Sequence, residues 1–359
     1  MKWLKNEAPR AKVRGLLERN TEPRLQSGRM YKTLFAILIL ALLCGLSYIF
    51  PILRPFKASL LMYIGKIWWA LLLGFILGGV IDHFVPREYI SHILARPAKR
   101  TILYAAFLGF LMSACSHGIL ALSIAIHKKG ASNPAVVAFL LASPWANLPV
   151  TLMLIAFFGM AKALYIIFSA LIIAITTGLI YQVLESKGII ETNKNTKSLS
   201  EDFSIISDFR KKLFAYKFSG SQLLIDVKGV YSGIRMLVDM VLWWILIGMG
   251  LASFIGSYVP QSIFHKYMGP TFAGMLATLA LATIIEVCSE GTAPLAFEIY
   301  RQTMAIGNAF TFLMAGVVTD YTEIGLLWIN VGRRVAIFLP IIAVPQVLIF
   351  GFIANLIFK

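Results

Sequence analysis

Long apolar stretches, separated by short polar ones, dominate the chain. Each is about 18–25 residues long, which is enough for a helix to cross a hydrocarbon core roughly 30 Å thick. Strands of an outer-membrane barrel would instead give segments of about ten residues with alternating polarity. The pattern therefore predicts an all-α polytopic membrane protein, with nine apolar segments at 33–50, 61–84, 101–126, 134–160, 163–184, 232–257, 270–298, 304–329 and 335–358.

The composition supports the membrane interpretation. Of the 359 residues, 58% are apolar and 14% are charged, whereas soluble domains carry about 25% charged residues. An ordinary soluble globular protein is thus excluded. A disordered chain is excluded as well, because disorder needs low hydrophobicity and high net charge.

Two polar stretches divide the chain. Residues 1–32 hold nine Lys/Arg and three Glu, which is typical of a cytoplasmic N-terminus that contacts anionic lipid beside a first helix. We expect a permanent extra span at 33–53 and no cleaved signal peptide. The stretch 185–230, with eight Lys/Arg and six Asp/Glu, is the expected cytoplasmic linker between two halves. Within it, residues 202–217 have apolar side chains at helical spacing.

The first half, 60–184, aligns with the second half, 231–359. The segment 115–118 (Cys-Ser-His-Gly) falls on 288–291 (Cys-Ser-Glu-Gly) at an offset of 173 residues. Repeats of this type are a signature of transporters, whose sites lie on discontinuous helices at the repeat interface. The sequence thus predicts two transmembrane repeats, about 60–184 and 230–358, with broken or re-entrant helices.

The Lys/Arg counts of the loops indicate that the two repeats are inverted. The loop 86–100 has four Lys/Arg and its partner 258–270 has one, and the positive-inside rule places the richer loop in the cytoplasm. Inverted repeats need an odd number of crossings, so one segment of each half, 132–160 and 304–332, is expected to be a re-entrant hairpin. The alternative is a parallel repeat with four full spans per half.

Ionisable side chains inside apolar segments are the first candidates for chemistry, because placing them in a membrane is costly. Acidic residues cluster in the seventh and eighth segments. We expect Glu286, Glu290, Asp320 and Glu323 to be candidates for proton coupling, and Glu298 lies in the same cluster. The alternative is a static hydrogen-bonded network that holds the helices together.

Cys115 and Cys288 occupy matching positions of the two halves, and the same offset pairs Asn147 with Asp320. If the repeat axis brings the helix breaks together, the two thiols converge, and soft thiolates select thiophilic ions. A buried packing role for both cysteines is the alternative. The predicted substrate site consists of Cys115, Ser116, His117, Asn147, Cys288, Ser289, Glu290 and Asp320.

Motifs of several common functions are absent from the sequence. It has no Walker A pattern, no His-Glu-x-x-His and no Gly-x-Ser-x-Gly, so we expect neither P-loop nucleotide binding nor zinc-protease or esterase chemistry. No nucleic-acid-binding motif accompanies the basic N-terminus. We therefore predict a non-enzyme without a cofactor, whose partners are a small-molecule or ion substrate and the lipid bilayer. The oligomeric state and any metal site stay open.

Five motifs together carry a resemblance: Cys-Ser-His-Gly (115–118), His-Lys-Lys-Gly-Ala-Ser (127–132), Ala-Phe-Leu-Leu-Ala-Ser-Pro (138–144), Cys-Ser-Glu-Gly-Thr-Ala-Pro (288–294) and the segment 312–323. Over roughly residues 60–358 the chain resembles the bacterial predicted permeases labelled YraQ-like, DUF318 or UPF0718, which include organoarsenical efflux permeases. The resemblance implies a multi-span inner-membrane permease with Cys115 and Cys288 as candidate substrate thiols. The chain departs from many members at His117, where they carry a second cysteine.

We therefore expect a secondary transporter of the bacterial inner membrane, with a cytoplasmic N-terminus. It would export a small solute, for which the resemblance suggests a thiophilic metalloid such as a trivalent organoarsenical, with proton coupling. In a first alternative, a permease for a divalent metal ion or small sulfur compound uses His117 and Glu290 as ligands. In a second, a non-transporting scaffold or sensor binds a partner through 185–230. A channel, which passes substrate without coupling, is a third.

Overall fold

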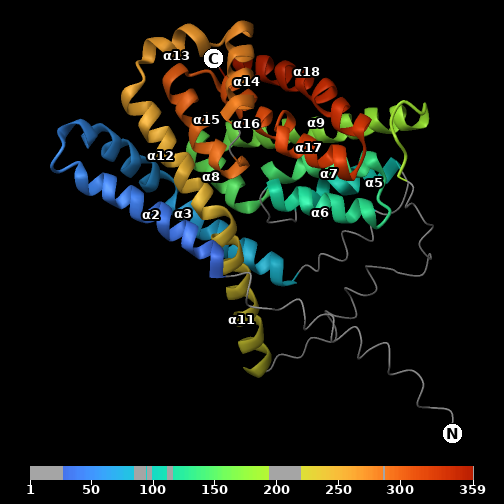
Figure 1. Ribbon diagram of the computed structural model, residues 1–359, viewed down its shortest axis with the longest axis horizontal. Helices are drawn as coiled ribbons and strands as arrows, with labels where there is room; N and C mark the ends of the chain where they lie inside the picture. Colours follow the sequence, from blue (N-terminus) through green and yellow to red (C-terminus); the bar gives the residue numbers. More distant parts are fainter. Residues whose placement is uncertain are drawn as a thin grey trace.

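In the computed structural model, the described residues are 27–84, 94, 99–110, 116–193, 220–285 and 288–358. Every element in this part of the chain is a helix, as the apolar pattern predicts (Figure 1). In chain order the helices are α2 (Ser27–Leu46), η2 (Pro51–Leu53), α3 (Arg54–Phe84), α5 (Lys99–Phe110), α6 (Ser116–Lys128), α7 (Asn133–Ala146), α8 (Leu148–Phe158), α9 (Met160–Ser186), α11 (Gly220–Leu237), η3 (Val238–Leu242), α12 (Trp243–Tyr258), α13 (Gln261–Met268), α14 (Phe272–Ile285), α15 (Ser289–Thr303), α16 (Ile306–Val318), α17 (Tyr321–Asn330) and α18 (Arg333–Ile357).

Five to seven segments of the described chain are long and apolar enough to cross a membrane. Two of the seven are helix pairs with a bend: Asn133–Trp145 with Leu148–Phe158 at 49°, and Gln261–Met268 with Phe272–Ile285 at 108°. The other five are single spans: Pro51–His83, Met160–Ser186, Asp226–Tyr258, Ile306–Asn330 and Arg333–Ile357.

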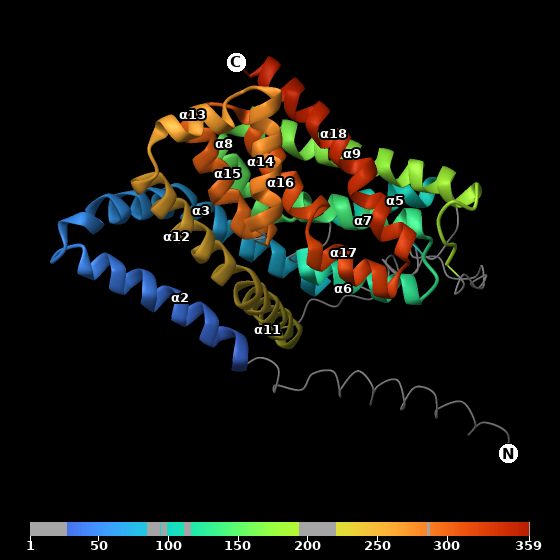
Figure 2. The same ribbon diagram turned by 45° about the horizontal axis from the view of Figure 1, so that its top comes forward.

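The core of the bundle lies around α7 and α16. Every described residue of these two helices is buried, and the fully buried side chains include Phe139 of α7 and Phe310 of α16. Figures 1 and 2 show α9 and α18 side by side along one side of this core, with α2, α3 and α12 on the opposite side. Both central helices end where the helical structure is interrupted, before α8 and before α17. Because both helices are buried, these two helix breaks lie inside the protein.

Three pairs of helices begin at the same spacing. α7 and α16 begin at residues 133 and 306, α8 and α17 at 148 and 321, and α9 and α18 at 160 and 333, so each pair is 173 residues apart. The packing matches as well. A Cβ on Gly178 of α9 would lie 3.0 Å from the Ala138 Cβ of α7, and a Cβ on Gly351 of α18 would lie 2.6 Å from the Thr311 Oγ1 of α16. Ala138 and Thr311 are also 173 residues apart.

The segment that follows α9 joins both halves of the chain at one end. The Asn193 amide donates to the His127 carbonyl oxygen at 2.7 Å, and the Asn133 amide donates to the Glu191 carbonyl oxygen at 2.5 Å. The Glu191 carboxylate in turn accepts from the backbone N–H of Arg334, at 3.1 and 3.2 Å. The turn between α6 and α7 is therefore connected to the start of α18.

The structure departs from the predicted segments at α13–α15. The predicted loop 258–270 contains α13, a helix of eight residues with Phe264 buried and Tyr267 exposed. A helix this short gives no clear signal in a hydropathy pattern. The predicted segment 270–298 is divided between α14 and α15, because the backbone is extended at Cys288, where ψ is 146°.

The expected re-entrant hairpins have different outcomes in the two halves. The segment 133–158 contains a bend of 49°, and because such a bend occurs in broken spans and in re-entrant loops alike, the hairpin at 132–160 stays a prediction. At 304–332 the structure differs, since Ile306–Asn330 has the length and hydropathy of a single span. Pro149 lies in the first turn of α8, whereas 306–330 contains no proline, and proline favours a sharp bend.

The polar stretch between the halves is only partly described. α11 begins at Gly220, inside the predicted linker 185–230, and continues through η3 into α12. The amphipathic helix predicted at 202–217 lies outside the described residues.

Candidate functional site

The first turn of α15 gathers three predicted site residues. Cys288 is the N-cap residue, and its carbonyl oxygen accepts from the backbone N–H groups of Gly291 at 2.7 Å and Thr292 at 3.0 Å. The Cys288 thiol and the Ser289 hydroxyl (3.0 Å) both donate to the Glu290 carboxylate. All three side chains are buried. A thiol, a hydroxyl and a carboxylate thus share one helix N-terminus, where the helix dipole favours negative charge.

Asn147 and Asp320 each cap the helix that follows a helix break. The Asn147 Oδ1 accepts from the backbone N–H of Val150 at 2.8 Å and caps α8. The Asp320 Oδ1 accepts from the backbone N–H of Glu323 at 2.9 Å and caps α17. Asn and Asp are preferred caps because a side-chain oxygen satisfies an otherwise unpaired N–H group of the first turn. Both side chains are buried, and so is Glu323.

Two glycines allow neighbouring helices to approach these breaks closely. A Cβ on Gly248 of α12 would lie 2.2 Å from the Gly291 carbonyl oxygen, in the first turn of α15. A Cβ on Gly74 of α3 would lie 2.6 Å from the Pro149 Cα, in the first turn of α8. Contacts this short leave no room for any other residue, so α12 and α3 hold the two breaks in place.

Helices from the two halves meet at the breaks. α8 packs against α15, and α6 packs against α17; Figures 1 and 2 both show α6 beside α17. Each helix that follows a break in one half therefore lies against a helix of the other half. This region is the candidate functional site.

Several predicted site residues are not placed by the structure. Cys115 and Glu286 lie outside the described residues. Ser116 and His117 begin α6, but their side chains lie outside the described part as well. Among the residues that the structure describes, no group of three or more His, Cys, Asp or Glu side chains is placed to hold a metal ion.

Glu298 forms a network that the residue pattern alone did not reveal. Its carboxylate accepts from Arg301 Nε at 2.9 Å and Nη2 at 2.7 Å, and from the Gln302 amide at 2.7 Å. It also accepts from the Tyr63 hydroxyl of α3. Both carboxylate oxygens accept hydrogen bonds from charged or strong donors. Glu298 therefore has a structural role, in which it connects α3 to α15. The i, i+3 spacing of Glu298 and Arg301 was the available signal, whereas Tyr63 is distant in sequence and gave none.

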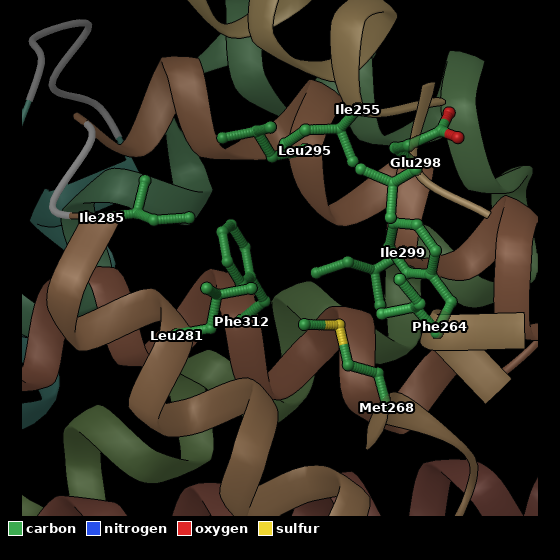
Figure 3. A pocket seen from close by; sticks show the side chains of 11 residues that line it. Ile255, Phe264, Met268, Leu281, Ile285, Leu295, Glu298, Ile299 and Phe312 are labelled. Carbon is green, nitrogen blue, oxygen red and sulfur yellow. The ribbon is translucent and has the colours of Figure 1, made fainter. Parts of the chain in front are cut away.

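An apolar cavity of about 200 Å³ lies beside Glu298, on the side away from its hydrogen-bond partners (Figure 3). Leu281, Leu295, Ile299 and Phe312 are among the residues that line it. Figure 3 shows the Glu298 carboxylate pointing away from Leu281 and Phe312, consistent with its hydrogen bonds to α3 and α15. The cavity therefore offers an apolar surface beside α15 and no charge.

Replacing Glu298 by Gln should destabilise the protein. The substitution removes the charge that Arg301 and Tyr63 bind while it conserves the shape, so we expect a loss of about 1–3 kcal/mol in the free energy of unfolding. Tyr63→Phe, which removes one donor, should lose about 1 kcal/mol. Thermal unfolding of the purified protein measures both. A Glu298→Gln protein as stable as the wild type would show that the network is not structural.

Comparisons with known proteins identify the family. Residues 55–356 match the ArsP_1 family, described as predicted permease. UPF0718 protein YcgR of Bacillus subtilis is 24% identical over 284 residues, which cover 78% of this chain and 90% of that protein. A Streptococcus mutans protein named putative two-component membrane permease complex subunit is 22% identical over 259 residues, or 72% and 80% of the two chains.

A third relative is UPF0718 protein MJ0584 of Methanocaldococcus jannaschii, 22% identical over 300 residues, which cover 69% of this chain and 80% of that protein. No solved structure matches the chain. The family match includes both helix breaks and the α15 cluster, and it begins after α2. The chain therefore belongs to the ArsP_1 family of predicted permeases, and it is a multi-pass membrane protein of a transporter family rather than an enzyme.

Proposed function

We propose that the chain is a secondary transporter that moves a small solute between two inverted repeats, about 60–184 and 230–358. The observation that carries this proposal is the pair of capped helix breaks at Asn147 and Asp320, at matching positions of the two halves. The equal spacing of α7–α9 and α16–α18 supports the repeat. Discontinuous helices in matching positions are the usual place of a transport site.

The proposed membrane topology follows from the charge distribution. The basic segment 1–32 and the linker 185–230 lie in the cytoplasm, because Lys/Arg-rich segments are retained there. The extra helix in 33–53 crosses the inner membrane before the first repeat. Opposite orientations of the two repeats then require an odd number of crossings in each.

The proposed substrate site combines residues of both repeats. The second repeat contributes Cys288, Ser289, Glu290 and Asp320, and the hydrogen bonds within the α15 turn support their acting together. The first repeat contributes Cys115, Ser116, His117 and Asn147. The contacts of α8 with α15 and of α6 with α17 support a site between the repeats.

We propose proton coupling through the buried acids at the helix starts. Glu290, Asp320 and Glu323 are buried, with exposed fractions of 0%, 4% and 0%, and Glu286 precedes Glu290 on the predicted segment 270–298. Glu298 is excluded from this role because Arg301, Gln302 and Tyr63 already bind its carboxylate.

For the substrate, we propose a thiophilic metalloid species such as a trivalent organoarsenical, moved outward. The buried Cys288 thiol beside a hydroxyl and a carboxylate supports a soft ligand. A trivalent methylarsenical has two exchangeable positions, which suits two converging thiols, Cys115 and Cys288. The alternative substrate is a divalent metal ion or small sulfur compound, with His117 and Glu290 as ligands.

Ligand-induced thermal stabilisation tests the site. Purified wild-type protein and the double variant Cys115→Ser/Cys288→Ser are compared with trivalent methyl- and phenyl-arsenicals, Zn(II), Cu(I), sulfite and thiosulfate. We expect an arsenical to raise the melting temperature of the wild type and to have no effect on the double variant, because the soft ligand needs thiolates. The variant Cys44→Ser, outside both repeats, is the matched control.

Two results would contradict the proposed substrate. Stabilisation by an arsenical that persists in the double variant would assign Cys115 and Cys288 to packing. Stabilisation by Zn(II) or a sulfur anion alone would shift the site to His117, Glu290 and Asp320.

A further inference from the structure

A second cavity has one wall outside the region that the family match covers and one wall inside it. It is a groove of about 440 Å³ between α2 and α12, and α2 precedes residue 55, where the family match begins. Its walls are apolar side chains such as Phe35 and Ile39 of α2 and Leu246 and Leu251 of α12. In Figures 1 and 2, α2 lies at the outside of the helical bundle, beside α12.

The length of the groove corresponds to one leaflet of a bilayer. The α2 residues that line it run from Tyr31 to Leu40, which is about 14 Å of helix at 1.5 Å per residue. Half of a hydrocarbon core roughly 30 Å thick is about 15 Å. The Leu40 side chain closes the inner end against α12, where a Cβ on Gly250 would lie 3.1 Å from its Cδ2.

A positively charged side chain lies at the end of the groove that is near the membrane surface. Lys32 is exposed, and its Nζ lies 5.2 Å from the centroid of the Trp243 ring on the opposite wall. No ion pair to Lys32 occurs within the part of the chain that the structure describes. Tryptophan, tyrosine and lysine together are typical of the level where lipid head groups meet the hydrocarbon, and Tyr31 lies beside Lys32.

We propose that this groove binds an anionic phospholipid of the membrane, with an acyl chain between α2 and α12 and the phosphate at Lys32. The apolar walls match the acyl chain, the length matches one leaflet, and the charge of Lys32 matches an anionic head group. A transmembrane helix of a partner or of a second copy is about 10 Å wide. A groove of this length and volume is too narrow to hold it.

Native mass spectrometry of the full-length protein tests this proposal. The protein in detergent is given phosphatidylglycerol or phosphatidylcholine with identical acyl chains, and the retained lipid is counted. We expect the wild type to prefer phosphatidylglycerol by about fivefold, the effect of one lysine at a membrane surface. Lys32→Gln should abolish the preference without changing the fold, because this side chain is exposed.

Two further variants separate the head group from the acyl chain. Gly250→Leu fills the groove, so it should retain less of both lipids. Lys57→Gln is the matched control, because the Lys57 Nζ also lies over a ring, 3.6 Å from the Tyr48 centroid, but outside this groove. It should behave as the wild type does.

Three results would overturn the proposal. The first is an equal retention of both lipids by the wild type. The second is a preference for phosphatidylglycerol that survives in Lys32→Gln, and the third is unchanged lipid retention in Gly250→Leu. A dimer of the wild type that Gly250→Leu dissociates would assign the groove to a second copy of this chain.

Discussion

Gly248→Ala should weaken ligand-induced stabilisation of the protein while leaving a folded molecule. The new Cβ would lie 2.2 Å from the Gly291 carbonyl oxygen, so either α12 or the first turn of α15 has to move. That turn carries Cys288, Ser289 and Glu290, whose hydrogen bonds depend on its position. Overpacking of this kind costs about 1–3 kcal/mol, which corresponds to a loss of affinity of about 5-fold to 150-fold.

The measurement is a titration of the purified variant with a trivalent phenylarsenical, followed by thermal unfolding. Gly65→Ala is the matched control, because no atom lies within 4 Å of a Cβ at that position. Gly74→Ala, which would press on Pro149, should act like Gly248→Ala if both breaks belong to one site. Wild-type affinity in Gly248→Ala would show that the α15 turn takes no part in binding.

Asp320→Asn should uncouple transport from the proton gradient without damaging the fold. An amide oxygen can accept the Glu323 N–H bond as Asn147 accepts that of Val150, so the cap of α17 is retained. The ionisable group is lost. One coupled proton supports about tenfold accumulation per pH unit, and accumulation in the variant should therefore fall to about one.

Proteoliposomes with an imposed gradient of one pH unit and a trivalent phenylarsenical provide the measurement. Asn147→Asp is the reciprocal variant, which adds an acid to the first break, and Asp320→Ala removes the cap at a cost of about 1 kcal/mol. Transport by Asp320→Asn that remains fully dependent on pH would remove Asp320 from the coupling mechanism and leave Glu286, Glu290 and Glu323.

The sequence was sufficient for the features that depend on composition and local chemistry. Apolar length predicted the spans, for example α9 and α18 from the segments 163–184 and 335–358. The alignment of the two halves paired Asn147 with Asp320, and the structure shows both at helix breaks. Because a cap needs only a side-chain oxygen one position before a helix, the local pattern contains this information.

Features that depend on distant contacts were beyond the sequence. Glu298 appeared as one more acid of the cluster, and only the approach of Tyr63 from α3 shows that its carboxylate is occupied. Gly248 is an ordinary glycine in an apolar run until the fold places it against Gly291. Bend angles were missed for a related reason: the direction of a helix after a break depends on what it packs against.

The equivalence of the two caps has an electrical consequence. Asn147 and Asp320 accept the same bond at nearly the same distance, so the negative charge of an ionised Asp320 is not needed to begin a helix. A charge that moves across the whole membrane exchanges about 2.3 kcal/mol with a voltage of 100 mV, whereas an amide exchanges none. An ionised Asp320 that moved through the membrane field during transport would therefore respond to voltage, whereas Asn147 would not.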